Sequence, residues 1–331
     1  LWRSDHGVPN EGTIDDFPPS LTTEWIQDWG IEVARGMARL LTQDPHTVVR
    51  LTREADVAQV LSEVAAENGK PRAGYYSPRA LIFKGYASVQ RTESFKRGWF
   101  EIQDEGSQLM SAFALTDADA APALQAHPTI ARAKFDAKAL ESALGLVPAG
   151  TVIDACAGSG GKTLALSDFL RGQGRVYAYD VYDRKVQALR KRAERAGESN
   201  IQAVVLEGDA QAVLSKFAGS ADRLLIDSPC SGWGVLRRNP DIKWSRKPRA
   251  TGSSEPERPI TYLQHQVVRD YLPLLKSGGV FTYGVCTFQK AETMDQVEWI
   301  LDSFPELTLR HSGFIGPHET DGFFMASFLK K

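Results

Sequence analysis

Cysteine is scarce in this sequence. Only three cysteines occur in 331 residues, namely Cys156, Cys230 and Cys286, and no two of them form a C-x-x-C pair. An odd count without paired spacing argues against a secreted disulfide framework and against a structural zinc site. We therefore expect no metal, and we expect all three thiols to be open to chemistry.

Long apolar runs and an excess of either charge are also absent. No apolar run reaches the roughly 18 residues of a membrane span, and the first residues lack the layout of a signal peptide. The net charge is only -2, so any contact with nucleic acid has to come from local basic patches. These features favour a monomeric protein of the cytoplasm without a membrane segment.

The chain is long enough for more than one domain, and its pattern divides into three stretches. Residues 1–44 combine an irregular start with amphipathic helices, and residues 45–110 form a small α+β unit of short strands and a helix. In residues 111–331 strands and helices alternate, and two strand-like segments, 306–316 and 322–330, close the chain. This alternation predicts an α/β fold, a doubly wound parallel sheet with helices on both faces.

A glycine-rich turn follows the first strand of the alternating region, in TVIDACAGSGGKT (151–163). Such glycines let backbone amides approach a ligand closely, although a tight turn in any doubly wound fold would look the same. A P-loop is excluded, because its first glycine would have to stand at Cys156. The spacing also departs from G-x-G-x-x-G, which argues against a dinucleotide oxidoreductase. The candidate cofactor contacts are Cys156, Ala157, Gly158, Ser159, Gly160, Gly161 and Lys162.

Acidic residues end three successive strands of the same region, at Asp180, Asp209 and Asp227. A single aspartate at such a place is often a helix cap or a solvated loop residue. Three at the carboxyl ends of parallel strands face one crevice, where Asp180 could accept both hydroxyls of a ribose and Asp209 could bind an adenine amino group. The pattern favours S-adenosyl-L-methionine over NAD as the cofactor.

Four motifs carry a family resemblance: DACAGSGGKT (154–163), DSPCSGWGVLRRNPDIKW (227–244), YGVC (283–286) followed by Glu292, and GWFEIQDEGSQL (98–109). Together they resemble the Sun-type (Fmu/nucleolar-protein) RNA cytosine-5 methyltransferase family, in its bacterial ribosomal-RNA branch. The resemblance implies a Rossmann-like methyltransferase sheet, preceded by N-terminal helices and by a small unit similar to an RNA-recognition fold. It also implies S-adenosyl-L-methionine as cofactor and RNA as substrate.

The resemblance distributes roles between two cysteines. Carbon 5 of cytosine is too weak a nucleophile to take a methyl group from a sulfonium until a thiolate has added to carbon 6. A Pro-Cys nucleophile, as in DNA cytosine methyltransferases, would point to Cys230, whereas the RNA family implies Cys286 as nucleophile and Cys230 as an aid to product release. Asp227 is expected to be a buried carboxyl group with a raised pKa that stabilises the ring nitrogen of the adduct. The Cys156 side chain is expected to be a small buried hydrophobe.

Three segments depart from the family's pattern, and one of them, residues 245–259, replaces a more helical stretch. The chain has Gly158-Ser159 where the family commonly has Ala-Pro, and Gly284-Val285 where it has Ser-Thr before the nucleophile. The second change removes a hydroxyl group that could donate a hydrogen bond near the thiol.

Two groups of residues indicate where RNA would lie. One lies within the second motif and just beyond it, and is either a phosphate track or a solvated loop: Arg237, Arg238, Lys243, Arg246, Lys247 and Arg249. The other lies in the small unit, where it could contact phosphates and stack on bases: Lys84, Arg91, Lys96, Arg97, Trp99 and Phe100. The target cytosine is expected in a single strand or a loop, because the base must leave its stack to react.

Ribosomal RNA is the expected substrate, and transfer RNA is the closest alternative, since only surface shape separates them. A catalytically weak RNA-binding assembly factor that keeps the pocket is a different class of function. The presence of both Cys230 and Cys286 together with Asp227 argues against that class. A Rossmann oxidoreductase is the third alternative, and the glycine spacing disfavours it.

Overall fold

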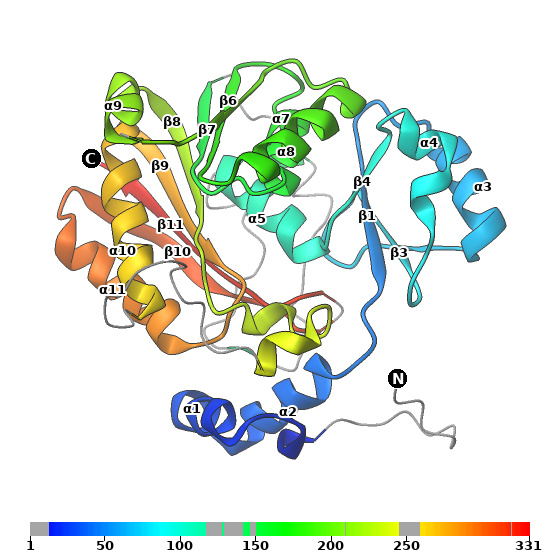
Figure 1. Cartoon of the computed structure of the whole chain (residues 1–331), viewed down its shortest axis with the longest axis horizontal. Coiled ribbons are helices and arrows are strands. Elements are labelled where there is room, and N and C mark those ends of the chain that lie inside the picture. Colours follow the sequence, from blue (N-terminus) through cyan, green and yellow to red (C-terminus); the bar gives the residue numbers. More distant parts are fainter. Residues whose placement is uncertain are drawn as a thin grey trace.

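Two sheets organise the part of the chain that the structure describes. This computed structural model describes residues 13–116, 128, 142–145, 150–208, 210–244, 259–318 and 320–331. A seven-stranded sheet and a four-stranded sheet lie side by side, and two N-terminal helices lie at one end of the molecule (Figure 1).

The N-terminal helices α1 (Pro19–Trp29) and α2 (Ile31–Leu41) meet at Gly30, where the sequence predicts a break. Gly30 has a φ of +80°, a conformation that glycine adopts without strain, and it ends the first helix. Trp25 and Met37 are fully buried and join the core on one face of the large sheet. Trp29 Nε1 donates to the carbonyl oxygen of Phe288 at 2.9 Å, so the helix pair contacts the segment that follows the YGVC motif.

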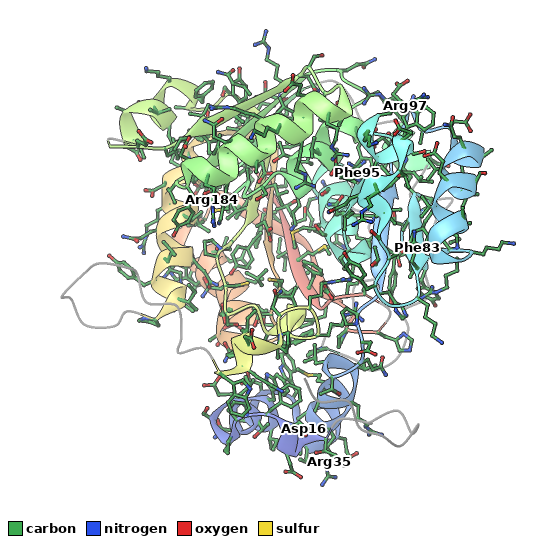
Figure 2. The ribbon with its side chains drawn as sticks, turned by 45° about the vertical axis from the view of Figure 1, so that its right-hand side comes forward. Asp16, Arg35, Phe83, Phe95, Arg97 and Arg184 are labelled. Atoms are coloured by element: carbon green, nitrogen blue, oxygen red, sulfur yellow. The ribbon has the colours of Figure 1, made fainter. Side chains whose placement is uncertain are left out.

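The four-stranded sheet has the order β2-β3-β1-β4, and each pair of neighbours is antiparallel. Its elements are β1 (Thr47–Leu51), α3 (Val57–Asn68), β2 (Arg72–Ala73), β3 (Ala80–Phe83), η2 (Val89–Arg91), α4 (Glu93–Lys96) and β4 (Phe100–Ile102). Phe83 and Phe100 are buried against Val60 and Val64 of α3. Figure 2 shows Phe83 and Phe95 within this unit and Arg97 at its surface.

The seven-stranded sheet has the order β10-β11-β9-β8-β5-β6-β7. The five strands β9, β8, β5, β6 and β7 pair with their neighbours in parallel. Strand β11, in contrast, pairs antiparallel with both β9 and β10. The strands are β5 (Thr151–Asp154), β6 (Arg175–Asp180), β7 (Ile201–Val205), β8 (Ala221–Asp227), β9 (Leu275–Val285), β10 (Leu307–Ile315) and β11 (Phe323–Lys330). The hairpin expected at the end of the chain is therefore confirmed as β10 and β11.

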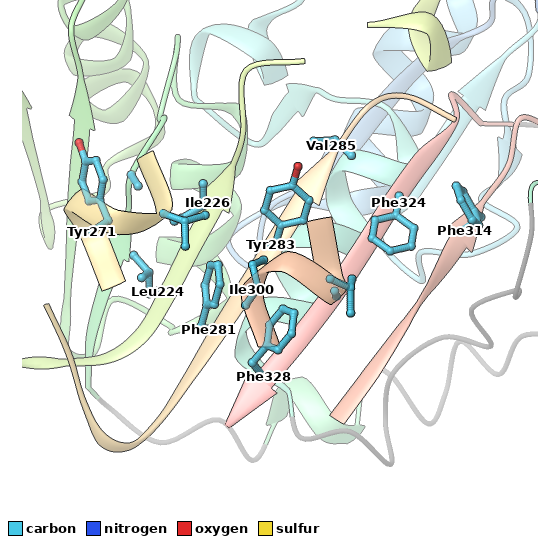
Figure 3. Packing of buried hydrophobic residues seen from close by; sticks show 14 of the residues in the cluster. Leu224, Ile226, Tyr271, Phe281, Tyr283, Val285, Ile300, Phe314, Phe324 and Phe328 are labelled. Atoms are coloured by element: carbon cyan, nitrogen blue, oxygen red, sulfur yellow. The ribbon is translucent and has the colours of Figure 1, made fainter. Parts of the chain in front are cut away.

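Helices cover both faces of this sheet. Leu224 and Ile226 point to one face and Leu225 to the other, as the alternation of a strand requires. Figure 3 shows the first face, where Phe281 and Tyr283 pack beside them. The helices of that face are α9 (Ala210–Leu214), α10 (Ile260–Tyr271) and α11 (Met294–Ser303), and those of the other are α5 (Glu105–Leu115), α7 (Gly161–Phe169) and α8 (Asp183–Ala196).

The predicted doubly wound fold with a small α+β unit and N-terminal helices is confirmed. Helix α5 runs through the predicted boundary at residue 110 and contacts β8, β9 and β11 of the large sheet. The division into units at residues 44 and 110 stays a prediction. Every helix in the described residues is too short or too polar to cross a membrane.

A buried aspartate joins the small sheet to the large one. Asp168 on α7 accepts from Arg50 Nη1 at 2.5 Å, from the backbone N–H of Arg53 at 2.9 Å and from Arg79 Nη1 at 3.1 Å. Arg50 and Asp168 are both almost fully buried. At a second place, Glu101 of β4 accepts from Arg192 and Arg195 of α8. Charge-assisted hydrogen bonds therefore fix the small sheet against α7 and α8.

Replacing Asp168 with alanine should lower the free energy of unfolding by about 3–5 kcal/mol, because the buried Arg50 guanidinium would lose its charged partner and keep the neutral Gln103. Chemical denaturation of the two proteins measures this difference. Glu93→Ala is the control: Glu93 pairs with Lys96 at an exposed site and should change the stability little. A similar small loss in both variants would show that the buried pair does not hold the two sheets.

Candidate active site

The turn between β5 and α7 has a conformation that its glycines permit. Gly158 and Gly160 have φ values of +54° and +87°, in the left-handed region. A Cβ at Gly160 would lie 2.6 Å from Cγ of Leu189 on α8, so a larger residue does not fit. A Cβ at Gly158 or at Gly161 would instead meet no atom within 4 Å. The outer surface of the turn is therefore open at the start of α7, where a ligand could approach the backbone.

Asp180 lies beside this turn, at the end of β6. Its carboxylate accepts from the backbone N–H of Gly158 at 2.8 Å and from that of Tyr182 at 2.9 Å. The two residues that follow it, Val181 and Tyr182, are 63% and 56% exposed. Sequence reasoning missed this apolar surface. Two large apolar residues directly after an acidic strand end could have indicated an exposed apolar contact beside the Asp180 carboxylate. Asp209 lies outside the described residues.

A row of hydrogen-bonded polar and ionisable groups runs from α7 to the end of β8. Lys162 Nζ donates to Asp227 Oδ2 at 2.6 Å, and Asp154 Oδ2 accepts from the Thr163 hydroxyl at 2.7 Å. Burial raises the pKa of Asp154 to about 7, although the bond from Thr163 opposes the shift. Burial alone would lower the pKa of Lys162, but the adjacent Asp227 carboxylate outweighs it and the net shift is upward. The Lys162 ammonium therefore stays charged and directed at Asp227.

The two cysteines of the motifs meet at the ends of β8 and β9. Their sulfur atoms, Cys230 Sγ and Cys286 Sγ, are 3.3 Å apart. The hydrogen bond with Cys286, together with burial, raises the pKa of Cys230 well above its ordinary value. Cys230 thus keeps its proton and can donate it toward the Cys286 sulfur. Cys156, in the cofactor turn, also keeps its proton, because burial raises its pKa.

Strand pairing holds this arrangement in place. Asp227 is paired with Gly284 across β8 and β9, and the backbone N–H of Ser228 donates to the Gly284 carbonyl at 2.8 Å. The N–H of Gly234 donates to the Cys286 carbonyl at 2.9 Å. A Cβ at Gly284 would lie 2.5 Å from Sδ and Cε of Met110 on α5, so Met110 occupies the space of a side chain there. Asp227, Cys230 and Cys286 thus lie together, with Lys162 beside them.

The arginines after Cys230 are internal, which corrects the expectation of a phosphate track at Arg237 and Arg238. Both donate to Asp321, through Nε atoms at 2.7 and 2.6 Å, and Arg238 Nη2 donates to Asp104 at 2.8 Å. The Arg237 side chain is only 5% exposed. These guanidinium charges are neutralised by buried carboxylates and connect the loop to the residue before α5. Arg246, Lys247 and Arg249 lie outside the described residues.

The RNA-facing residues expected in the small unit divide into two kinds. Phe100 is fully buried and offers no stacking surface, which corrects that expectation. Trp99 is partly exposed, and the Arg97 guanidinium lies 5.1 Å from its ring centre. Four basic side chains are at the surface: Lys84, Arg91, Lys96 and Arg97. Tyr86, which sequence reasoning did not single out, is 92% exposed after β3.

A doubly wound sheet whose carboxyl edge combines a glycine turn, an acidic strand end and a pair of contacting cysteines defines a methyltransferase of the S-adenosyl-L-methionine-dependent class. The sequence pattern of the family described as 16S rRNA methyltransferase RsmB/F matches residues 141–329. The chain belongs to this family, and it is an RNA methyltransferase of this type. The resemblance stated from the motifs is thereby confirmed.

Individual relatives agree with this membership. The chain is 30% identical to the "Probable ribosomal RNA small subunit methyltransferase B" of Bacillus subtilis, over 98% of this chain and 71% of the relative. It is 27% identical to the protein of the same name in Synechocystis, over 95% of this chain and 67% of that protein. Among solved structures, NSun6 from Pyrococcus horikoshii with SFG matches with a TM-score of 0.73 at 17% identity, covering 96% and 99% of the two chains. That last likeness concerns the fold alone.

The residues of the site fit S-adenosyl-L-methionine, on which the family depends. Each Asp180 oxygen accepts one backbone N–H and keeps a lone pair for a ribose hydroxyl. Val181 and Tyr182 offer apolar surface beside it, and the turn at Gly158 is open. When bound, this cofactor supplies an electrophilic methyl group. Within the described residues, no group of three or more histidine, cysteine or acidic side chains could hold a metal ion.

The stability of the site should depend on pH through Asp154. Between the ordinary value of 3.8 and the folded pKa of about 7, the folded state binds a proton that the unfolded chain releases. The free energy of unfolding should therefore fall as pH rises through this window. Asp154→Asn removes the titration, so the wild type should lose on the order of 2 kcal/mol more than the variant between pH 5 and 8. Urea denaturation at each pH measures the difference, and parallel pH profiles would contradict the buried, protonated state.

Proposed function

We propose that the protein transfers a methyl group from S-adenosyl-L-methionine to carbon 5 of a cytosine in small-subunit ribosomal RNA, through a covalent adduct on Cys286. The observation that carries this proposal is the 3.3 Å contact between Cys230 Sγ and Cys286 Sγ beyond the carboxyl ends of β8 and β9. One strand end presents a sulfur atom for attack, and the neighbouring strand end presents a thiol that keeps its proton. The names of the relatives support ribosomal RNA as the substrate.

The first half of the reaction activates the base. The Cys286 thiolate forms a bond to carbon 6 of the ring, and the electrons of the double bond between carbons 5 and 6 move into the ring system. A proton that reaches the ring nitrogen through the Asp227 carboxyl group neutralises the electron density gained by the ring, and the Lys162 ammonium bonded to Asp227 stabilises the carboxylate that remains. Carbon 5 would then form a bond to the methyl carbon as the bond between that carbon and the sulfonium sulfur of the cofactor breaks, which leaves a neutral thioether.

The second half restores the base and frees the protein. Carbon 5 gives up its proton, and that electron pair re-forms the ring double bond while the bond between carbon 6 and sulfur breaks. The Cys286 sulfur leaves with the bonding electrons. The Cys230 thiol, which contacts this sulfur, donates a hydrogen bond to it and stabilises the departing thiolate. The balance is one cytosine methylated and one proton released for each methyl group used.

The arrangement of the units supports a division of labour. We propose that residues 45–110 hold RNA through the surface cations of the small unit, while residues 111–331 carry out methyl transfer.

The proposed cofactor contacts are Cys156, Ala157, Gly158, Ser159, Gly160, Gly161, Lys162, Asp180, Asp209 and Asp227. We also propose that the enzyme acts as a monomer in the cytoplasm. We propose no metal, since neither the addition of a thiolate to carbon 6 nor methyl transfer from a sulfonium to carbon 5 needs a Lewis acid.

The choice of RNA is tested by methylating naked small-subunit ribosomal RNA and transfer RNA under the same conditions. We expect a cytosine in the ribosomal RNA to become resistant to bisulfite conversion, whereas transfer RNA stays unmodified. Bisulfite sequencing measures the activity and locates the base in one experiment. Equal or better modification of transfer RNA would transfer the proposal to that substrate, and no resistant cytosine in either RNA would leave only an RNA-binding role.

The two cysteines are distinguished by what accumulates when each is removed. Cys286→Ala should abolish methylation and form no covalent complex, because no thiolate can add to carbon 6. Cys230→Ala should still attack and methylate but release the product slowly, so that protein stays attached to RNA. A denaturing gel should show a retarded, RNase-sensitive band for Cys230→Ala and none for the double variant. The reverse pattern would make Cys230 the nucleophile.

A further inference from the structure

The loop that carries Cys230 is bonded on both sides of the cysteine by two buried side chains. Gln264 Nε2, on α10, donates to the carbonyl oxygen of Pro229 and to Glu292 Oε2, each at 3.0 Å. The backbone N–H of Ser231 donates to the same Glu292 oxygen at 2.9 Å. Both Gln264 and Glu292 are almost fully buried. The residue before Cys230 and the residue after it are thus held by one connected set of hydrogen bonds.

The same set is anchored to the strand of the other cysteine. Glu292 ends η8 (Lys290–Glu292), the short helix between Cys286 and α11, and its backbone carbonyl accepts from the Tyr283 hydroxyl at 2.9 Å. Tyr283 belongs to β9, three residues before Cys286. A further bond at 2.8 Å joins the hydroxyl groups of Ser231 and Thr287. The positions of the two sulfur atoms are therefore set relative to each other through Glu292.

We propose that Gln264 and Glu292 are positioning residues that hold the Cys230 thiol against the Cys286 sulfur for the release step. This inference rests on the proposed roles of the two cysteines. Cys230 lies outside any helix or strand, so its place depends on hydrogen bonds of the loop backbone. Bonds to a buried carboxylate are stronger than neutral ones, and a misplacement of about 1 Å costs on the order of 100-fold in rate.

The charge of Glu292 also acts on the thiol itself. The hydrogen bond with Cys286 and burial are the main reasons for the raised pKa of Cys230, and the charges of Glu292 and Asp227 raise it further. The Lys162 ammonium, which lies near the two cysteines, is bonded to Asp227. Glu292 therefore helps to keep the proton that Cys230 offers to the departing sulfur.

Three variants test the clamp formed by Gln264 and Glu292. Gln264→Met keeps the volume but removes both hydrogen bonds, and Glu292→Ala removes the acceptor. Both should methylate in the first turnover, then release product roughly 10- to 100-fold more slowly and accumulate the covalent complex on a denaturing gel. Glu292→Gln should recover most of the release rate, because one amide oxygen can accept from both donors as Glu292 Oε2 does.

Gln108→Met is the matched control. Gln108 is a buried glutamine of α5, on the face of the sheet opposite to α10, and its amide donates to the Gln103 carbonyl. The loss of this hydrogen bond should not trap RNA. Thermal melting identifies variants that fail to fold, and Gln264→Met, which deletes no charge, decides the question if Glu292→Ala does not fold. Alkylation of Cys230 in the RNA-free proteins, read by peptide mass spectrometry, is a second measurement that should show faster labelling in Gln264→Met than in the wild type.

Cys230→Ala on the same gel separates this inference from the proposed function. If Cys230→Ala accumulates the complex while Gln264→Met and Glu292→Ala turn over and label like the wild type, the clamp is overturned and the roles of the cysteines stand. If Cys230→Ala itself accumulates no complex, the proposed roles fail, and faster labelling of Cys230 then shows only that the two residues position the loop. Equal trapping in Gln108→Met would reduce the effect to a general loss of packing.

Discussion

The pairing of β8 with β9 is the constraint on which the site depends. Two adjacent parallel strands end at the same edge, and their register sets Asp227 opposite Gly284. Cys230 and Cys286 each follow shortly after these strand ends, so a short loop from either side is enough to bring the sulfur atoms into contact. Because the strands are buried on both faces by α10 and α5, the edge has little freedom to shift.

Buried carboxylates connect the parts of the chain that surround these strand ends. Asp168, Glu101 and Asp321 each accept from two or more arginine side chains or backbone groups that come from distant parts of the chain. These arginines form ion pairs that connect the small unit, α8 and the loop after Cys230. Their charges are neutralised within the protein. The exposed cations of the small unit are therefore the ones available to a polyanion.

Much of this architecture could be predicted from periodicity and turn chemistry. The strands of the large sheet, the glycine turn and the acid at Asp180 all carry local signals, and the motifs pointed to the right family. Helix α5 could not be read in this way, because nearly all of its residues are buried and its pattern lacks a polar face.

The internal arginines escaped sequence reasoning for a different reason. Arg237 and Arg238 looked like a surface cluster, since their acidic partners Asp104 and Asp321 lie far away along the chain. Long-range ion pairs leave no local pattern. The bond between Gln264 and Glu292 leaves none either, because the two residues come from separate helices, although Glu292 itself stands in one of the motifs.

The contact between Met110 and Gly284 links two positions that the chain separates widely. A Cβ at position 284 would meet the thioether end of Met110, so a side chain there requires this flexible end to turn away from the strand that leads to Cys286. A serine at position 284, as in the family's pattern, therefore requires the facing methionine to take another rotamer or a smaller residue to replace it. Across the family, the residue at position 110 should therefore differ in rotamer or in size between members with glycine and members with serine at position 284.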